Sequence, residues 1–234
     1  MDYLSSKDIT KDMKKFNLYR HIPRPAFTMI ELIMSIVVLG ILAAIALPRL
    51  EISHKQDAAD AILSNIRYTQ HLALMDYKHK FDDPKWQQRF WKIMFATCAN
   101  GDYFYRIGSD DDADSAGTFE KKEAAIDPLN GLPLYLANND INCDTDTSVS
   151  KEIFLTKKFG ITNISAANCN NLFHIGFDHL GRPHQGYGNS VSPDYSSYMN
   201  TTCTYRFTMS DGDTFDISIV PETGYAQIVG QDGS

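Results

Sequence analysis

The sequence predicts an α+β fold, in which a long N-terminal α-helix, membrane-spanning over its first half, packs on an antiparallel β-sheet. Three features predict this fold. An apolar run extends from Phe27 to Leu47, a helical pattern of apolar residues continues to about residue 80, and short strand-like segments separated by turn residues fill the C-terminal half. The 234 residues, 43% of them hydrophobic, are enough for one folded domain beyond the helix.

Charged residues are unevenly distributed along the chain. Residues 1–26 hold six basic and three acidic side chains, a net charge of +3, although the whole chain has a formal net charge of -7. A basic flank before an apolar run predicts a cytoplasmic N-terminus, with the acidic remainder exported. The acidic balance also argues against strong nucleic-acid binding, which depends on basic side chains.

The apolar run is long enough to cross a bilayer. As a helix its 21 residues would measure about 31 Å, and the hydrocarbon core is about 30 Å thick. Two ordinary interpretations are a plain signal anchor and a cleaved secretory signal, for which residues 44–46 offer a small-residue cleavage site. Neither accounts for Glu31, because a carboxylate inside the bilayer costs about 3 kcal/mol on insertion scales.

The string FTMIEL at residues 27–32, with the apolar helix and Pro48 after it, resembles the processing and assembly segment of type IV pilins and type II secretion pseudopilins. In that family a prepilin peptidase cuts before the phenylalanine, methylates the new amine and leaves a glutamate as the fifth mature residue. The resemblance therefore implies a cytoplasmic leader at 1–26, cleavage after Ala26, N-methylation of Phe27, and assembly roles for Glu31 and Pro48. Ala26 is a departure, since the family normally has glycine there.

This resemblance implies a structural subunit, not an enzyme, with a pilin-like fold and no cofactor. Its filament would belong to a type II secretion or type IV pilus-like system serving protein secretion, pilus assembly or DNA uptake. The implied partners are other pilin or pseudopilin subunits, the prepilin peptidase, an inner-membrane assembly platform and the lipid bilayer. The subunit would cross the bacterial inner membrane once, with its C-terminal domain in the periplasm. The alternative is a periplasmic enzyme or binding domain on a simple N-terminal anchor.

Glu31 has a physical role in such a filament. After removal of the leader, one subunit presents a charged amine on Phe27 and a neighbour presents the Glu31 carboxylate, both inside an apolar helical bundle. Pairing offsets much of the cost of burying each charge. A charged pair also sets the register between neighbouring helices better than apolar contacts do.

Beyond the membrane helix at 27–48, an amphipathic continuation is predicted at 49–80 and an α+β globular domain at 81–234. Pro48 should bend the helix, and residues 82–84, Asp-Asp-Pro, should end the helical pattern. The inward face of the continuation should carry Ala59, Ile62, Leu63, Ile66, Thr69 and Ala73. A second short helix is predicted at 85–96, its aromatic residues buried against the first.

Strands are predicted at 103–107, 153–157 and 172–177, which are short β-prone runs. A C-terminal meander is predicted from 204–209, 214–220 and 225–229, because SDGD and PETG supply turn residues between these runs. This region, with FDHLGRP at 177–183 and ISIVPETGYAQIV at 217–229, resembles the domain of minor pilins and pseudopilins of the GspH and FimT type. Other pilin subclasses stay open at this point.

Cysteine usage agrees with export. Cys98, Cys143, Cys169 and Cys203 all follow the apolar run, and an even number in an oxidising compartment favours disulfides. Three connectivities are possible, of which the sequential one, Cys98 with Cys143 and Cys169 with Cys203, is preferred. A zinc site is poorly supported, since no CxxC pair is present.

An acidic segment at 108–120 places Asp110, Asp112 and Asp114 at alternating positions. Hard oxygen ligands at this density can hold calcium. The segment lacks the glycine and final glutamate of an EF-hand, so a solvated acidic loop is the competing interpretation. No catalytic motif such as GxSxG, HExxH or GxGxxG occurs in the sequence.

Overall fold

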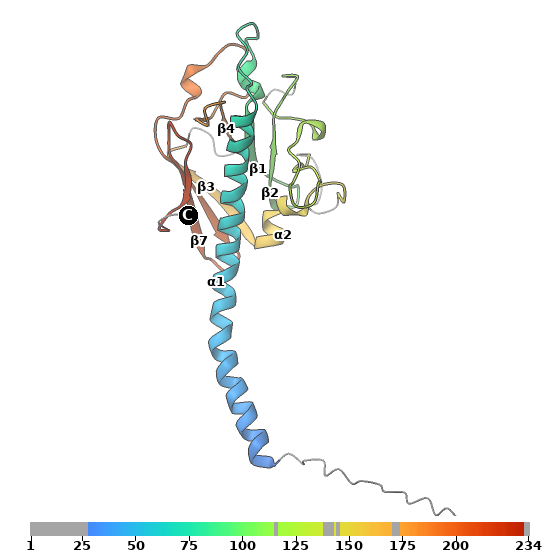
Figure 1. Ribbon diagram of the computed structural model, residues 1–234, viewed down its shortest axis with the longest axis vertical. Coiled ribbons are helices and arrows are strands. Elements are labelled where there is room, and N and C mark those ends of the chain that lie inside the picture. The colour runs from blue at the N-terminus through green and yellow to red at the C-terminus, as the bar shows by residue number, and fades with distance from the viewer. Residues whose placement is uncertain (1–27, 115–116, 138–142, 144–145, 170–173, 232–234) are drawn as a thin grey trace, which may run out of the picture. The chain divides into compact units, whose positions relative to one another are not determined.

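The computed structural model describes residues 28–114, 117–137, 143, 146–169 and 174–231, and the side chains of 45–53 lie outside this set. The chain forms two compact units that divide between Ala46 and Leu47. Over the described residues the fold is α+β, with one long N-terminal helix and two antiparallel sheets (Figure 1).

Helix α1 extends from Met29 to Met75. It ends before the predicted residue 80. Asp76, the residue after the helix, bonds through its side chain to the first strand and to Lys78. The Asp76 carboxylate accepts a hydrogen bond from Trp91 Nε1 at 2.9 Å and pairs with Lys78 Nζ at 2.6 Å, which holds the chain after Met75 against the first strand. Polar residues at 76–80 offer no apolar face that would continue the helix.

No helix in the described part of the chain is both long enough and apolar enough to cross a membrane. The predicted membrane segment, 27–48, is described only in part, since residue 27 and the side chains of 45–48 lie outside the described set.

Two four-stranded sheets make up the second unit. The first has the order β2-β1-β4-β5 and the second the order β3-β6-β7-β8. The bounds of the first sheet's strands are β1 Trp91–Thr97, β2 Tyr103–Gly108, β4 His174–Phe177 and β5 Pro183–His184. Those of the second are β3 Ile161–Ala167, β6 Cys203–Met209, β7 Thr214–Ile219 and β8 Ala226–Ile228. Short helices are α2 Leu155–Phe159 and single 3-10 turns at Trp86–Arg89, Lys121–Glu123, Lys151–Ile153 and Tyr195–Ser197.

One face of α1 belongs to the core that both sheets share. Its buried residues form the same apolar cluster as Ile93 of β1, Ile175 of β4 and Phe207 of β6. The helical members of this cluster are Ala58, Ala59, Ile62, Leu63, Ile66 and Ala73. Figure 1 shows the second half of α1 in front of the strands, with β1 and β2 to one side of it and β3 and β7 to the other. Three of the six helical residues are alanines, which let the helix approach the strands closely.

The predicted C-terminal meander is confirmed. Strands β6, β7 and β8 pair antiparallel in sequence order, with Phe207 opposite Phe215 and Ile219 opposite Ala226. The tight turn between β6 and β7 is closed by a hydrogen bond from Met209 N to Asp213 O at 2.8 Å. Strand β3, which the sequence analysis did not predict, pairs with β6 and extends the meander to four strands.

The predicted helix at 85–96 is wrong. One 3-10 turn, Trp86–Arg89, precedes strand β1 at Trp91–Thr97. This strand is central in its sheet. Its backbone groups form hydrogen bonds with β2 on one side and with β4 on the other. The periodicity of an apolar run does not distinguish a buried strand from a buried helix. Here the neighbouring strands β2 and β4 favour the strand.

The predicted strand at 153–157 is also wrong. A 3-10 turn, Lys151–Ile153, and helix α2 occupy this segment. Ser150 caps the turn by accepting a hydrogen bond from Glu152 N, and Gly160 ends α2 in the left-handed conformation at φ 71°. These two capping residues stabilise helical turns at either end.

Gln70 of α1 joins the two sheets at one point. Its Nε2 donates to Gly181 O, in the loop after β4, at 2.9 Å and to Thr223 O, in the turn after β7, at 2.8 Å. Gly224 adopts φ +65°, and a Cβ there would lie 2.2 Å from Gly181 O and 2.6 Å from Gln70 Nε2. Only glycine therefore fits position 224 without moving the helix or the loop.

Substitution of this glycine should loosen the junction. We expect Gly224→Ala to lower the free energy of unfolding by about 2–3 kcal/mol, since it adds a backbone clash to the cost of a positive φ. Gly212→Ala is the matched control, because Gly212 also has a positive φ, +92°, but open space around it. Chemical denaturation measures both, and equal losses for the two variants would contradict the proposed clash.

Candidate functional site

Glu31 lies in the first turn of α1, which Thr28 caps. Thr28 O and Oγ1 accept hydrogen bonds from Glu31 N at 3.1 and 3.3 Å, and Ser35 Oγ donates to Glu31 O at 2.7 Å. All these bonds use the backbone of Glu31. Among the described residues no hydrogen bond or ion pair to its carboxylate is found. An acidic side chain in this turn is favoured by the partial positive charge of the helix N-terminus.

The residues around Glu31 are apolar and exposed. Eleven large apolar side chains between Met29 and Leu42 are 47–83% exposed. They occupy all sides of the helix, because they are nearly consecutive in the sequence. A helix that is apolar all round needs lipid or other apolar chains around it. Glu31 is the one acidic residue among residues 28–44.

The structure describes little of the other predicted processing and assembly residues. Ala26 and Phe27 lie outside the described residues. Pro48 lies within α1, and its side chain is outside the described set.

Comparison with known families assigns this segment. The family model of the prokaryotic N-terminal methylation motif matches residues 24–47. The chain carries the type IV pilin and pseudopilin signature. No curated protein and no solved structure matches the chain. The match covers residues 24–47, so the pilin signature rests on the residues just before α1 and on the first part of that helix.

The second unit of this pilin-signature chain contains two disulfides, Cys98–Cys143 and Cys169–Cys203. These are the pairings that sequence order favoured. Cys98 follows β1 directly, and Cys169 and Cys203 join the end of β3 to the start of its neighbour β6. Both bridges therefore fix the ends of strands.

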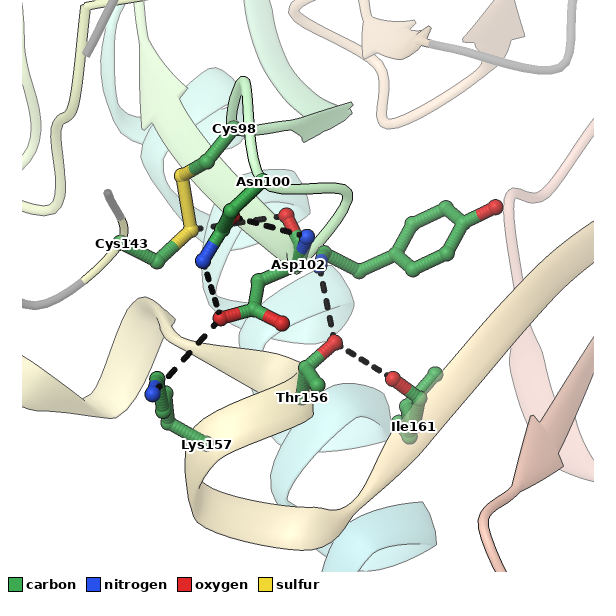
Figure 2. Close-up of a disulfide and its surroundings, with 8 residues drawn as sticks. Cys98, Asn100, Asp102, Cys143, Thr156, Lys157 and Ile161 are labelled. Atoms are coloured by element: carbon green, nitrogen blue, oxygen red, sulfur yellow. Dashed lines mark hydrogen bonds and ion pairs between the residues drawn. A yellow bond between two sulfur atoms is a disulfide. The ribbon is translucent and has the colours of Figure 1, made fainter. Parts of the chain in front are cut away.

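Figure 2 shows the Cys98–Cys143 disulfide beside the turn that joins β1 and β2. The Asp102 carboxylate of this turn accepts from Asn100 Nδ2 at 2.9 Å and lies 3.9 Å from Lys157 Nζ on α2. Thr156 Oγ1 accepts from Tyr103 N at 2.8 Å and donates to Ile161 O at 2.5 Å. The bridge, α2 and the first residue of β3 are thus held together.

The acidic segment forms a carboxylate cluster that differs from the predicted set. One oxygen each of Asp110, Asp112 and Glu123 lie within 4.8 Å of one another. Asp114 is not part of this group, and Glu123, which the sequence analysis did not select, takes its place. Three convergent carboxylates can supply oxygen ligands to a hard cation such as calcium. A calcium site here stays a prediction.

Glu123 also has a structural role in this cluster. Its Oε1 accepts from Asp111 N at 2.9 Å and its Oε2 from Glu120 N at 2.8 Å, so it fixes the loop at both ends. Glu120 and Glu123 form a reciprocal capping box on the 3-10 turn that follows the loop. An acidic residue at the third position of such a turn is the sequence signal that could have identified it.

Cations lie near these carboxylates. Lys122 Nζ is 3.2 Å from Asp112, and hydrogen bonding to Lys122 holds the pKa of the Asp112 carboxyl below its usual range. Lys92 of β1 is 0% exposed, and its Nζ donates to Gln88 O at 2.8 Å and Gly117 O at 3.2 Å. Burial lowers the pKa of Lys92 to about 8, although Asp110 and Glu123 favour its charged form.

A series of Asp, His and Ser side chains lies beside the edge strand β5 of the first sheet. His184 Nδ1 lies 3.0 Å from Ser197 Oγ, and His184 Nε2 lies 3.4 Å from Asp178 Oδ2. Burial would raise the pKa of the Asp178 carboxyl, but hydrogen bonds from His184 and Arg182 outweigh it and hold that pKa well below its usual range. Sequence reasoning missed this series, because no motif marks it.

Hydrolases use the same three residue types, with the serine open to substrate. In this chain the serine is buried. Ser197 is 2% exposed, and its Oγ donates to Asp194 O at 2.7 Å. A nucleophilic serine must instead present its oxygen to substrate in a pocket. The geometry supports a structural role, in which Asp178, through Leu180 N and Arg182 N, also fixes the loop between β4 and β5.

The buried lysine predicts a specific pH dependence. Because the pKa of Lys92 is about 8 in the folded chain and about 10.4 when unfolded, the unfolded state binds more protons between these values. Stability should therefore rise as pH increases from 7.5 to 9.5, by on the order of 2 kcal/mol. Above pH 10 the buried tyrosines Tyr105 and Tyr205 reverse the trend, since burial raises their pKa values.

Urea denaturation at several pH values measures this effect. Lys92→Met should abolish the rise, whereas Lys122→Met, at an exposed position, should retain it. An unchanged rise in the Lys92→Met variant would show that another group is responsible.

Proposed function

We propose that the chain is a minor pilin or pseudopilin, a structural subunit of a type II secretion or type IV pilus-like filament. One observation carries this proposal. Glu31 stands alone in the first turn of an otherwise apolar, exposed helical segment, inside the methylation motif at 24–47. A plain membrane anchor has no use for this carboxylate, whereas a bundle of processed subunits supplies the amine that pairs with it.

In this proposal prepilin peptidase removes residues 1–26 and methylates Phe27. The chain waits in the inner membrane as a single-pass protein, held by residues 27–48, with its C-terminal domain in the periplasm. The charge difference across the apolar run and the two disulfides support this topology, since disulfides persist in oxidising compartments. An inner-membrane assembly platform then transfers the subunit from the bilayer to the filament.

The GspH and FimT type of minor subunit is the subclass we favour. The support is the C-terminal meander with its PETG turn and the loop FDHLGRP. In this loop Gly181 O accepts a hydrogen bond from Gln70 of α1, and Arg182 Nε donates to the Asp178 carboxylate. Protein secretion, pilus assembly and DNA uptake all use the same helix chemistry. The acidic balance of the chain argues against strong nucleic-acid binding by this subunit.

Mass spectrometry of the mature N-terminus tests the processing step. N-methylphenylalanine at Phe27 is the expected result. A mature chain starting at Leu47 would indicate ordinary signal cleavage, and an intact leader would indicate the alternative, a periplasmic enzyme or binding domain on a simple anchor.

Replacement of Glu31 tests its role in assembly. Glu31→Leu should insert in the membrane normally, because it removes a charge that costs about 3 kcal/mol there, but should reduce incorporation into filaments at least tenfold. Asp82→Leu, an exposed carboxylate outside α1, is the control and should assemble normally. Normal incorporation of Glu31→Leu, measured by immunoblotting of sheared filaments, would defeat the proposed pairing.

A further inference from the structure

Exposed apolar side chains gather where α1 ends. Leu74 and Met75 lie at the end of the helix, Tyr77 and Phe81 in the segment after it, and Leu180 in the loop between β4 and β5. These five residues form the loop patch. Each is more than half exposed, and Phe81 is 92% exposed. Single apolar residues are ordinary on a protein surface, but a group of this size marks a binding surface.

Two histidines connect the members of the loop patch. The centre of the Tyr77 ring lies 4.5 Å from that of His179, the residue before Leu180. On the other side, Tyr77 Oη lies 3.2 Å from His79 Nδ1, and the His79 ring is centred 4.4 Å from that of Phe81. The aromatic residues of the segment after α1 and the loop after β4 therefore form one surface.

The loop patch projects from the second unit. Figure 1 shows the segment after α1 extending beyond the labelled strands. Leu74 borders the loop after β4, since a Cβ on Gly181 would lie 3.3 Å from Leu74 Cδ2. Phe81, by contrast, is almost free of neighbours. A lipid bilayer is fluid and closes around a projecting apolar side chain without a pre-formed pocket.

Lysines alternate with the aromatic residues of this segment. Residues 77–81 read YKHKF, and Lys85 precedes Trp86. Protein–protein interfaces are depleted in lysine. Segments that lie at a bilayer surface instead combine lysine with tyrosine, tryptophan and phenylalanine. The composition therefore favours a lipid surface over a protein partner.

The local charge favours an anionic surface. Lys80 and Lys85 are exposed, and no ion pair involves either of them in the part of the chain that the structure describes. Asp82 is exposed beside them, and Asp83 is neutralised by Arg89 at 2.6 Å. Two unpaired lysines thus face one unpaired aspartate, although the whole chain has a net charge of -7.

We propose that the loop patch docks on a phospholipid bilayer. Phe81 and Leu180 enter the boundary between headgroups and acyl chains, and Lys80 and Lys85 contact anionic headgroups. This inference rests on the proposed function at one point, because a chain anchored through residues 27–48 keeps the patch near a bilayer at high effective concentration. It adds a membrane contact made by the globular unit.

Fluorescence quenching by lipid tests the contact in the full-length chain. The four native cysteines are all in disulfides, so a dye on Pro84→Cys reports from this segment alone and leaves its charge unchanged. The variant is reconstituted in vesicles of phosphatidylcholine and phosphatidylglycerol, with or without a nitroxide on the acyl chains. We expect the nitroxide lipid to quench about half of the fluorescence or more.

Substitutions in the same labelled chain identify the apolar anchors. Phe81→Ser/Leu180→Ser should reduce the quenching about fivefold, because it removes the side chains that enter the bilayer. Leu129→Ser/Val229→Ser is the matched control, since both residues are exposed and apolar but lie outside the loop patch. It should leave the quenching unchanged. Equal quenching in the two double variants would overturn the proposed docking.

Charge reversal tests the lysines. Lys80→Glu/Lys85→Glu should reduce the quenching in vesicles that contain phosphatidylglycerol, and should leave it unchanged in vesicles of phosphatidylcholine alone. The same quenching as the parent chain in both kinds of vesicle would show that headgroup charge has no part in the docking.

Flotation of the vesicles separates this inference from the proposed function. A chain that floats with the vesicles but is not quenched would overturn the docking, leave the pilin-like function standing and indicate a protein partner for the loop patch. A chain that does not float would count against both proposals.

Discussion

The buried face of α1 is the constraint on which the second unit depends. From Ala58 to Ala73 this face lies in the same apolar core as residues of both sheets, and the side chain of Gln70 bonds to a loop of each. The sheets share no strand pairing. They meet in one core, in which Phe95 of β1 packs on Tyr205 and Phe207 of β6 and to which α1 contributes one face. Burial of this much apolar area dominates the stability of such a domain.

A single helix thus presents two chemistries. Nearly all of its residues up to Leu42 are apolar and exposed, and need lipid or neighbouring chains around them. Its residues from Ala58 to Ala73 divide instead into a buried apolar face and an exposed polar face. Glu31 is the charged exception in the first of these environments. Under the proposed function, this carboxylate specifies how neighbouring subunits align, since apolar packing alone tolerates sliding.

The parts of the fold that the sequence predicted are those set by local chemistry. Strands β6, β7 and β8 were predicted because turn residues such as Gly212 separate them, and the disulfides because the cysteines pair in order. Residues 91–97 were misread, since an apolar run does not reveal whether pairing partners exist on both sides. Glu123 was missed because it joins Asp110 only through the fold of the loop.

The contribution of α1 to the core has a practical consequence for soluble fragments. A recombinant domain that starts at the first strand would lack the α1 residues of the core, from Ala58 to Ala73, and would expose the apolar side chains that they cover. We expect such a fragment to aggregate, because exposed apolar surface favours association. A fragment that omits only the apolar segment and begins near Leu47, where the second compact unit starts, keeps these α1 residues and is the natural starting point for crystallisation.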